Sequence, residues 1–148
     1  MRKIAGVIML VTLAGCMTMP GTKPKVTLQF RPGSNTPVEG FTEMTVTGTD
    51  HKVFISNEIL LSNGDVESSR VVPGSIGPEV EIVFTKTGAE KFTRATEHNI
   101  MKPLGILVDG QLICAPIVHE KISGGRAEIT GKFSAQEARR IADGITEK

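Results

Sequence analysis

Residues 104–118 read Leu-Gly-Ile-Leu-Val-Asp-Gly-Gln-Leu-Ile-Cys-Ala-Pro-Ile-Val, and residues 119–133 continue with His-Glu-Lys-Ile-Ser-Gly-Gly-Arg-Ala-Glu-Ile-Thr-Gly-Lys-Phe. Asp109 and Gly110 separate two apolar runs, and both residue types tolerate positive φ, which is the strongest short-range signal for a β-hairpin. Gly124 and Gly125 predict a second hairpin turn, which would join residues 118–122 to residues 127–130. The stretch therefore predicts consecutive antiparallel strands.

Helix signals flank this stretch on both sides. Residues 80–84 alternate like a strand, and Thr87-Gly88-Ala89-Glu90 then has the spacing of a capping box that opens a helix. Pro103 ends that helix. A second capping box, Ser134-Ala135-Gln136-Glu137, opens a C-terminal helix whose apolar residues recur with the helical period: Ala138, Ile141, Ala142 and Ile145.

The N-terminal half predicts shorter elements. The strands expected there cover residues 26–30, 44–47 and 52–56, and residues 31–40 are expected to form a loop because they contain Pro32, Gly33 and Pro37. Ser62 is the expected N-cap of a short helix, and residues 71–77 cannot continue that helix. The fold class is therefore α+β: an antiparallel or mixed sheet with two main helices packed on one face, within one domain over residues 26–148.

The second half contains three spaced motifs: Phe-Thr-x-x-Gly-Ala-x-x-Phe from Phe84, Ile-Leu-Val-Asp-Gly-x-x-x-x-Ala-Pro from Ile106, and Ile-x-Gly-Gly-x-x-x-Ile-x-Gly-x-Phe-x-x-x-Glu-Ala from Ile122. Together they resemble the periplasmic head domain of SecD, an accessory subunit of the Sec protein-export machinery. The similarity is strongest over residues 52–145. The resemblance implies contact with an unfolded or emerging polypeptide. It does not extend to the transmembrane helices that house SecD's proton-driven mechanism, so we expect no motor here.

The N-terminus resembles a bacterial lipoprotein signal. Arg2 and Lys3 precede an apolar run that is shorter than the roughly 20 residues of a membrane-spanning helix. The run closes with Leu-Ala-Gly-Cys16, which looks like a lipobox; an ordinary secretory signal that happens to contain Cys16 is the alternative. We expect a signal peptide over residues 1–15, acylation of Cys16 and a tether over residues 16–25. Met17 is not the Asp typical of inner-membrane retention. We therefore expect a lipid-anchored, periplasm-facing envelope protein, in the outer membrane rather than the inner membrane.

Composition and motif spacing argue against several function classes. The formal net charge is +1 and the chain has no Trp or Tyr, so we expect neither nucleic-acid binding nor aromatic stacking platforms. The three histidines have no metal-ligand spacing. Asp109 and the Gly124-Gly125 pair are explained by turns, the His119–Glu120 pair by a solvated strand, and Ser75 by a glycine-rich turn. We expect no metal, no cofactor, no small-molecule substrate and no enzymatic activity.

Cys114 is the one thiol that remains once Cys16 is acylated. In an oxidising compartment it could form an intermolecular disulfide or react as a free thiol. Its neighbours Ile113 and Ala115 favour a third interpretation, a small apolar side chain buried on a strand.

Two function hypotheses follow. The first is a lipid-anchored binding module that contacts polypeptide segments, for which strand addition at an open sheet edge is one route. The second is a structural or assembly accessory that holds one specific envelope partner near the membrane.

Overall fold

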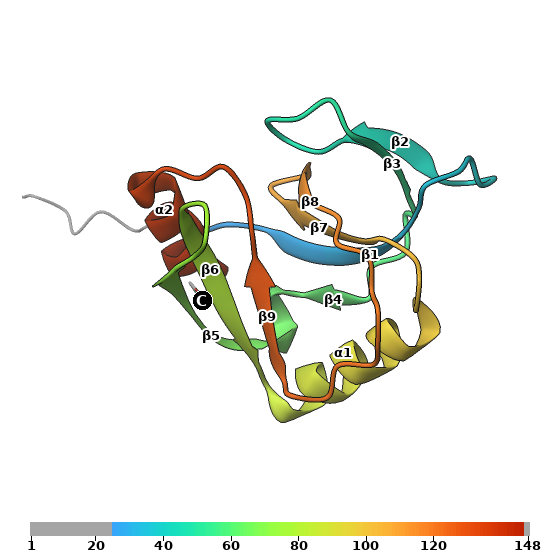
Figure 1. Cartoon of the computed structure of the whole chain (residues 1–148). Coiled ribbons are helices and arrows are strands. Elements are labelled where there is room, and N and C mark those ends of the chain that lie inside the picture. Colours follow the sequence, from blue (N-terminus) through green and yellow to red (C-terminus); the bar gives the residue numbers. More distant parts are fainter. Residues whose placement is uncertain (1–24, 147–148) are drawn as a thin grey trace, which may run out of the picture.

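The computed structural model describes residues 25–146 (Figure 1). The predicted signal peptide, Cys16 and the predicted tether up to residue 24 lie outside the described residues. In chain order the elements are β1 (Leu28–Ser34), β2 (Thr42–Thr45), β3 (Lys52–Ile55), β4 (Leu61–Ser62), the 3₁₀ helix η1 (Asn63–Asp65), β5 (Val66–Pro73), β6 (Pro78–Phe84), α1 (Lys86–His98), β7 (Leu104–Val108), β8 (Gln111–Cys114), β9 (Arg126–Ile129) and α2 (Ala135–Ile145). The predicted α+β class with two main helices is confirmed, and the strands divide between two sheets.

The larger sheet has the strand order β2-β3-β1-β7-β8, with β4 also paired to β1, and all of these pairs are antiparallel. Figure 1 shows the β2–β3 hairpin lying next to β8. The backbone N–H of Thr47, just past β2, donates a 2.8 Å hydrogen bond to the carbonyl of Leu112 on β8. The two ends of the sheet therefore meet, and the curled sheet encloses a small apolar core of its own: Val53, Ile55, Leu107 and Leu112.

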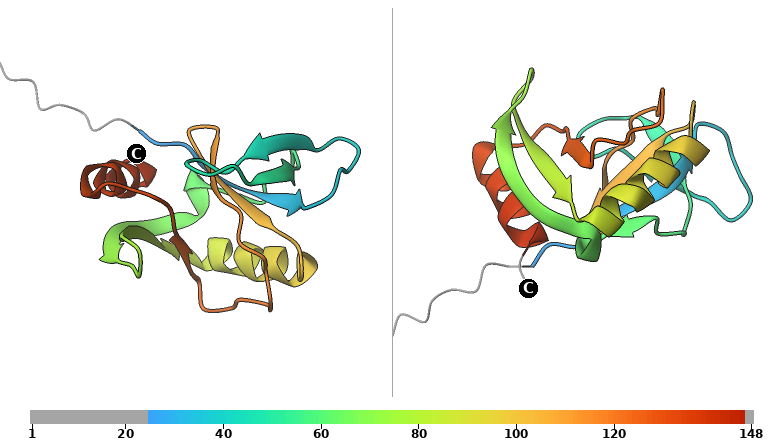
Figure 2. Two further views of the ribbon diagram at one scale, coloured as in Figure 1. Left: turned by 45° about the horizontal axis from the view of Figure 1, so that its top comes forward. Right: turned by 90° about the horizontal axis from the view of Figure 1, so that it is seen from below.

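The smaller sheet has the order β5-β6-β9 and is also antiparallel. The amphipathic helix α2 packs against β5 and β6, and α1 contacts β4, η1 and β6 (Figure 2). Both helices begin at hydroxyl caps. Thr85 Oγ1 accepts from the Gly88 N–H, and Ser134 Oγ accepts from the Glu137 N–H.

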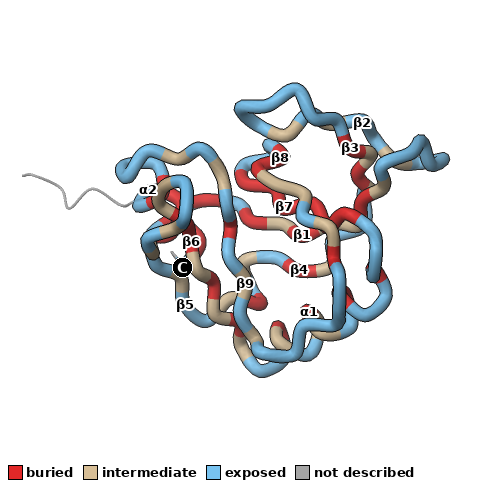
Figure 3. The backbone as a smooth tube through the Cα atoms, in the orientation of Figure 1, coloured by how far each residue is buried: buried red, intermediate tan, exposed pale blue. Residues whose placement is uncertain are grey.

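A cluster of three phenylalanines joins the two sheets to α1. Phe30 comes from β1, Phe84 from β6 and Phe92 from α1, and all three are buried. Their ring centroids lie 4.8 to 5.9 Å apart, at a separation where aromatic pairs contribute about 0.5–1.5 kcal/mol beyond their buried area. Figure 3 shows the buried residues concentrated along the strands, with exposed loops around them.

Three sequence-based expectations need correction in the first two thirds of the chain. The first strand continues to Ser34 instead of ending at Phe30, because the Gly33 N–H and the Pro32 carbonyl find partners in Pro103 and Ser56. The helix α1 begins two residues earlier than its predicted capping box, with Thr85 as the cap. The sequence pattern does not indicate strand β5, because β5 is an edge strand whose exposed polar residues hide the alternation.

The second predicted hairpin is wrong. Residues 118–122 form no strand, and β9 pairs with β6 instead of folding back on them. Gly125, with φ of +66°, turns the chain onto β6, and its carbonyl accepts a 2.9 Å hydrogen bond from the Phe84 N–H. Gly124 and Gly125 therefore lie at the entry to β9. The sequence after them predicts a strand, but it does not encode which strand β9 pairs with, and this is why the hairpin prediction is wrong.

Candidate functional site

A cavity of about 480 Å³ lies beside β9, between the two sheets and α1. Its volume falls within the range of roughly 300–1,000 Å³ that is typical of ligand sites. The lining residues come from six segments of the fold, and the buried apolar ones are Phe30 on β1, Phe92 on α1, Leu104 and Ile106 on β7, and Val118. The cavity is therefore an extension of the phenylalanine core towards the surface.

One wall of the cavity is the segment from Pro116 to Gly125, which we call the strap. Backbone hydrogen bonds attach it to residues 100–104, which follow α1. The Leu104 N–H donates to the Pro116 carbonyl at 2.9 Å, and the N–H of Met101 donates to the Val118 carbonyl at 2.7 Å. Pro116 has no N–H for a ladder, so regular strand pairing ends there.

The far part of the strap is attached to α1 by a side chain. Thr96 is fully buried, and its Oγ1 accepts a 2.9 Å hydrogen bond from the Ile122 N–H. The Ile122 side chain is 40% exposed although it lines the cavity. The strap therefore closes one side of the cavity and leaves apolar surface at its mouth.

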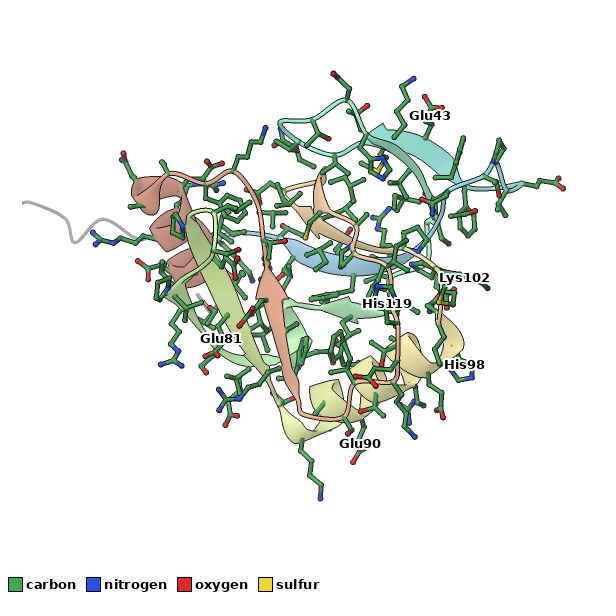
Figure 4. All side chains as sticks on the ribbon, viewed as in Figure 1. Glu43, Glu81, Glu90, His98, Lys102 and His119 are labelled. Carbon is green, nitrogen blue, oxygen red and sulfur yellow. The ribbon has the colours of Figure 1, made fainter. Side chains whose placement is uncertain are left out.

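Charged residues ring the opening. Glu81 on β6 accepts a 2.7 Å hydrogen bond from Arg70 Nε and lies 3.4 Å from Arg126 Nη1. The hydrogen bond from Arg70 holds the pKa of the Glu81 carboxyl below its ordinary value. Figure 4 shows His119 on the strap and Glu81 on the other side of β9 in that view. The site thus combines an apolar interior with a polar rim.

The residues that the sequence singled out do not gather at this cavity, apart from His119 and Glu120. Asp109 and Gly110, with φ of +50° and +78°, connect β7 to β8. The Asp109 carboxylate accepts hydrogen bonds from the Thr27 N–H and from Arg140 Nη1. It therefore connects the β7–β8 hairpin to the residue that precedes β1 and to α2. Within residues 25–146 no group of His, Cys, Asp and Glu is arranged to hold a metal ion.

His119 and Glu120 lie on the strap and are exposed, not on a strand as the sequence suggested. Ser75 lies in the exposed turn between β5 and β6, where the Gly74 N–H donates to the Gly77 carbonyl.

Cys114 ends β8 and is half-buried. Burial raises the pKa of its thiol to about 11, and hydrogen bonds from the backbone and side chain of Thr130 oppose that rise. The thiol therefore stays protonated at neutral pH, in keeping with a packing role.

Sequence reasoning missed the cavity itself. Phe30, Phe92 and Ile106 stand out in the sequence only as core residues, and no local signal indicates that they border a void. The one available hint is the proline at position 116, which interrupts a β-rich run and lets the strap leave the sheet. No helix within the described part of the chain is long and apolar enough to cross a membrane.

Comparison with known proteins agrees with this architecture. The family model described as SecDF, P1 head subdomain, matches residues 38–145. The chain is 42% identical over 84 residues to the protein translocase subunit SecDF of Thermus thermophilus, which covers 56% of this chain and 11% of that protein. It is 31% identical over 121 residues to SecD of Acidaminococcus fermentans, covering 81% of this chain and 29% of that protein.

A solved structure of SecDF in its super-membrane-facing form superposes with a TM-score of 0.69 at 28% identity, over 84% of this chain and 19% of that one. The chain spans less than a third of each of these relatives. On the family match, the chain belongs to the SecDF P1 head family.

Proposed function

We propose that this protein is a membrane-anchored envelope lipoprotein whose P1 head domain binds segments of unfolded or extended polypeptide in the cavity beside β9. The proposal assigns the domain a binding role linked to protein export, with neither a proton-driven motor nor an enzymatic activity of its own. The relatives are subunits of a protein translocase, which supports a polypeptide as the occupant.

The cavity carries the proposal. The interior consists of Phe, Leu, Ile and Val side chains. Burying an apolar group of the bound peptide there stabilises the complex by roughly 25 cal/mol per Å² of apolar surface removed from water, whatever the peptide sequence. The polar rim and the exposed Ile122 at the mouth fit a segment that passes across the opening and inserts one or two apolar side chains. The buried polar side chain in the described lining, Thr96, already uses its Oγ1 in hydrogen bonds with Phe92, Thr93 and Ile122, so it offers little to a small polar substrate.

Peptide binding tests the site directly. Ala127 lines the cavity from β9, so Ala127→Leu should reduce its volume and weaken binding of a fluorescent apolar peptide about tenfold in an anisotropy titration. Ala135→Leu is the matched control, because Ala135 is exposed at the start of α2 and lies outside the cavity lining. Equal affinity of the two variants would remove the cavity from the binding site.

Membrane attachment is the second part of the proposal. Cys16 would carry the acyl chains, and a tether of about nine residues reaches roughly 30 Å at full extension, so the domain would work close to the bilayer. We expect radiolabelled palmitate to enter the wild type and not Cys16→Ser. Density-gradient fractionation should place the acylated protein in the outer membrane, and recovery with the inner membrane would reverse that assignment.

Crosslinking in cells separates the two hypotheses for the bound partner. A photoreactive amino acid in place of Ile122, at the mouth of the cavity, should crosslink to many secreted proteins in transit. A single stoichiometric envelope partner would instead support an assembly accessory, and Ala135 replaced in the same way is the control position.

A further inference from the structure

We infer that the occupant binds as an added β-strand on the open edge of β9, with the backbone groups of Arg126 and Glu128 forming the new hydrogen bonds. The inference rests on the proposed function and specifies how the polypeptide is held there. The occupant is an extended segment whose side chains alternate between the cavity and the rim.

The register of the smaller sheet fixes which β9 groups are available. Phe84 and Gly125 are directly opposite, and the Phe84 N–H donates to the Gly125 carbonyl. In an antiparallel ladder hydrogen-bonded and non-hydrogen-bonded pairs alternate. The pairs Val83–Arg126 and Glu81–Glu128 are therefore non-hydrogen-bonded. The N–H and C=O groups of Arg126 and Glu128 point away from β6.

Thr130 independently supports the assignment of which β9 backbone groups point away from β6. It continues the same alternating set two residues after Glu128, and its backbone forms a hydrogen bond with the Cys114 thiol at the end of β8. The outward direction from β9 thus leads towards the larger sheet. Contact between the two sheets exists at Thr130, and within the described chain no strand other than β6 pairs with β9 along Arg126 to Glu128.

The cavity lies at this unpaired edge. Ala127 and its neighbours Arg126 and Glu128 project to opposite faces of the sheet, because successive strand residues alternate. All three line the cavity, as does Glu81 opposite Glu128. A void bordered by both faces of a strand must extend around its edge, where an added strand would lie.

Side-chain alternation then sets the occupant's pattern. On the inner face every second side chain would enter the apolar cavity near Ala127. On the outer face the others would lie beside Glu128, which is exposed and has no partner within residues 25–146. Opposite charges on neighbouring strands contribute roughly 0.2–1 kcal/mol, which favours Lys or Arg at that outer position. A one-residue slip would move the apolar set out of the cavity.

Backbone-modified peptides test this mode. The probe is a fluorescent ten-residue peptide in which Val alternates with Thr or Lys. Two variants accompany it: one is N-methylated at every Val, and the other is N-methylated at every Thr and Lys. Strand addition uses the N–H groups of one alternating set only, so one variant should lose at least tenfold in affinity and the other should lose much less. Hydrogen exchange of the Arg126 and Glu128 amides should slow when the unmodified peptide binds.

A protein variant gives the matching result. Glu128→Pro removes an N–H that β6 does not use, so the sheet should form while peptide affinity falls at least tenfold. Glu128→Ala keeps the N–H and loses only the carboxylate, so affinity should fall no more than about fivefold, the factor that corresponds to about 1 kcal/mol. Similar affinity for all three peptides, with Ala127→Leu still weakening binding, would overturn strand addition and leave the cavity as the site. Failure of all three peptides to bind would overturn the proposed function and this inference together.

Discussion

The side-chain amide of Asn63 donates a 2.9 Å hydrogen bond to the carbonyl of Ile145, 82 residues later in the chain. The same amide nitrogen donates to the Val26 carbonyl at 2.7 Å, and Asn63 Oδ1 accepts from the Leu28 N–H at 2.8 Å. One residue of the 3₁₀ helix η1 therefore satisfies backbone groups at the approach to β1 and at the end of α2. These are the two ends of the described chain.

We expect Asn63→Ala to lower the free energy of unfolding by about 3 kcal/mol, because three backbone groups lose their partner at once. Urea denaturation measures this loss. Asn57→Ala is the control, since Asn57 is exposed in the loop before β4, and it should change stability by less than about 0.5 kcal/mol. A comparable loss for both variants would mean that the Asn63 bonds contribute nothing specific.

The glycines at the entry to β9 should respond differently to the same substitution. Gly125 has φ of +66°, and a Cβ there would lie 3.3 Å from the Ala89 Cβ. Gly125→Ala should therefore cost about 1–2 kcal/mol in thermal or urea unfolding. Gly124 has no atom within 4 Å of the place of a Cβ, so Gly124→Ala should stay within about 0.5 kcal/mol. Equal losses at the two positions would contradict this backbone assignment.

The sequence predicts local structure correctly where a few neighbouring residues decide it. Asp109-Gly110 specifies its own turn, and Ser134 with Glu137 specifies the start of α2. The partner of β9 was not readable, because it depends on Gly125 directing the chain to β6 across 40 residues of intervening sequence. The cavity was hidden for the same reason: its walls meet only after both sheets, α1 and the strap have assembled.

Cys114 should react slowly in the folded protein. Raising the pKa of its thiol from 9.0 to about 11 lowers the thiolate fraction at pH 8 roughly 100-fold, and the thiolate is the nucleophile. In a Cys16→Ser variant, where Cys114 is the remaining thiol, alkylation by iodoacetamide should be at least 100-fold slower than in urea. Folded-state labelling within a few-fold of the unfolded rate would show that the thiol is accessible and ionised.

The Glu81 carboxylate at the rim of the cavity links stability to pH. The Arg70 hydrogen bond lowers the pKa of Glu81 in the folded state, whereas the unfolded chain returns it to its ordinary value of 4.5. The associated stability is therefore present above that value and is lost as the pH falls towards the lower, folded-state pKa. Between about pH 5 and pH 3 the wild type should lose more stability than Arg70→Gln, measured by urea unfolding at each pH.

Arg139→Gln is the matched control for that experiment. Arg139 is exposed on α2, and no partner for it is found within residues 25–146, so its removal changes net charge equally without touching Glu81. Its pH profile should run parallel to that of the wild type. NMR titration of the Glu81 carboxyl should show its pKa rising in Arg70→Gln and unchanged in Arg139→Gln. If the two variants flatten the profile alike, overall charge and not the Arg70–Glu81 pair sets the acid sensitivity.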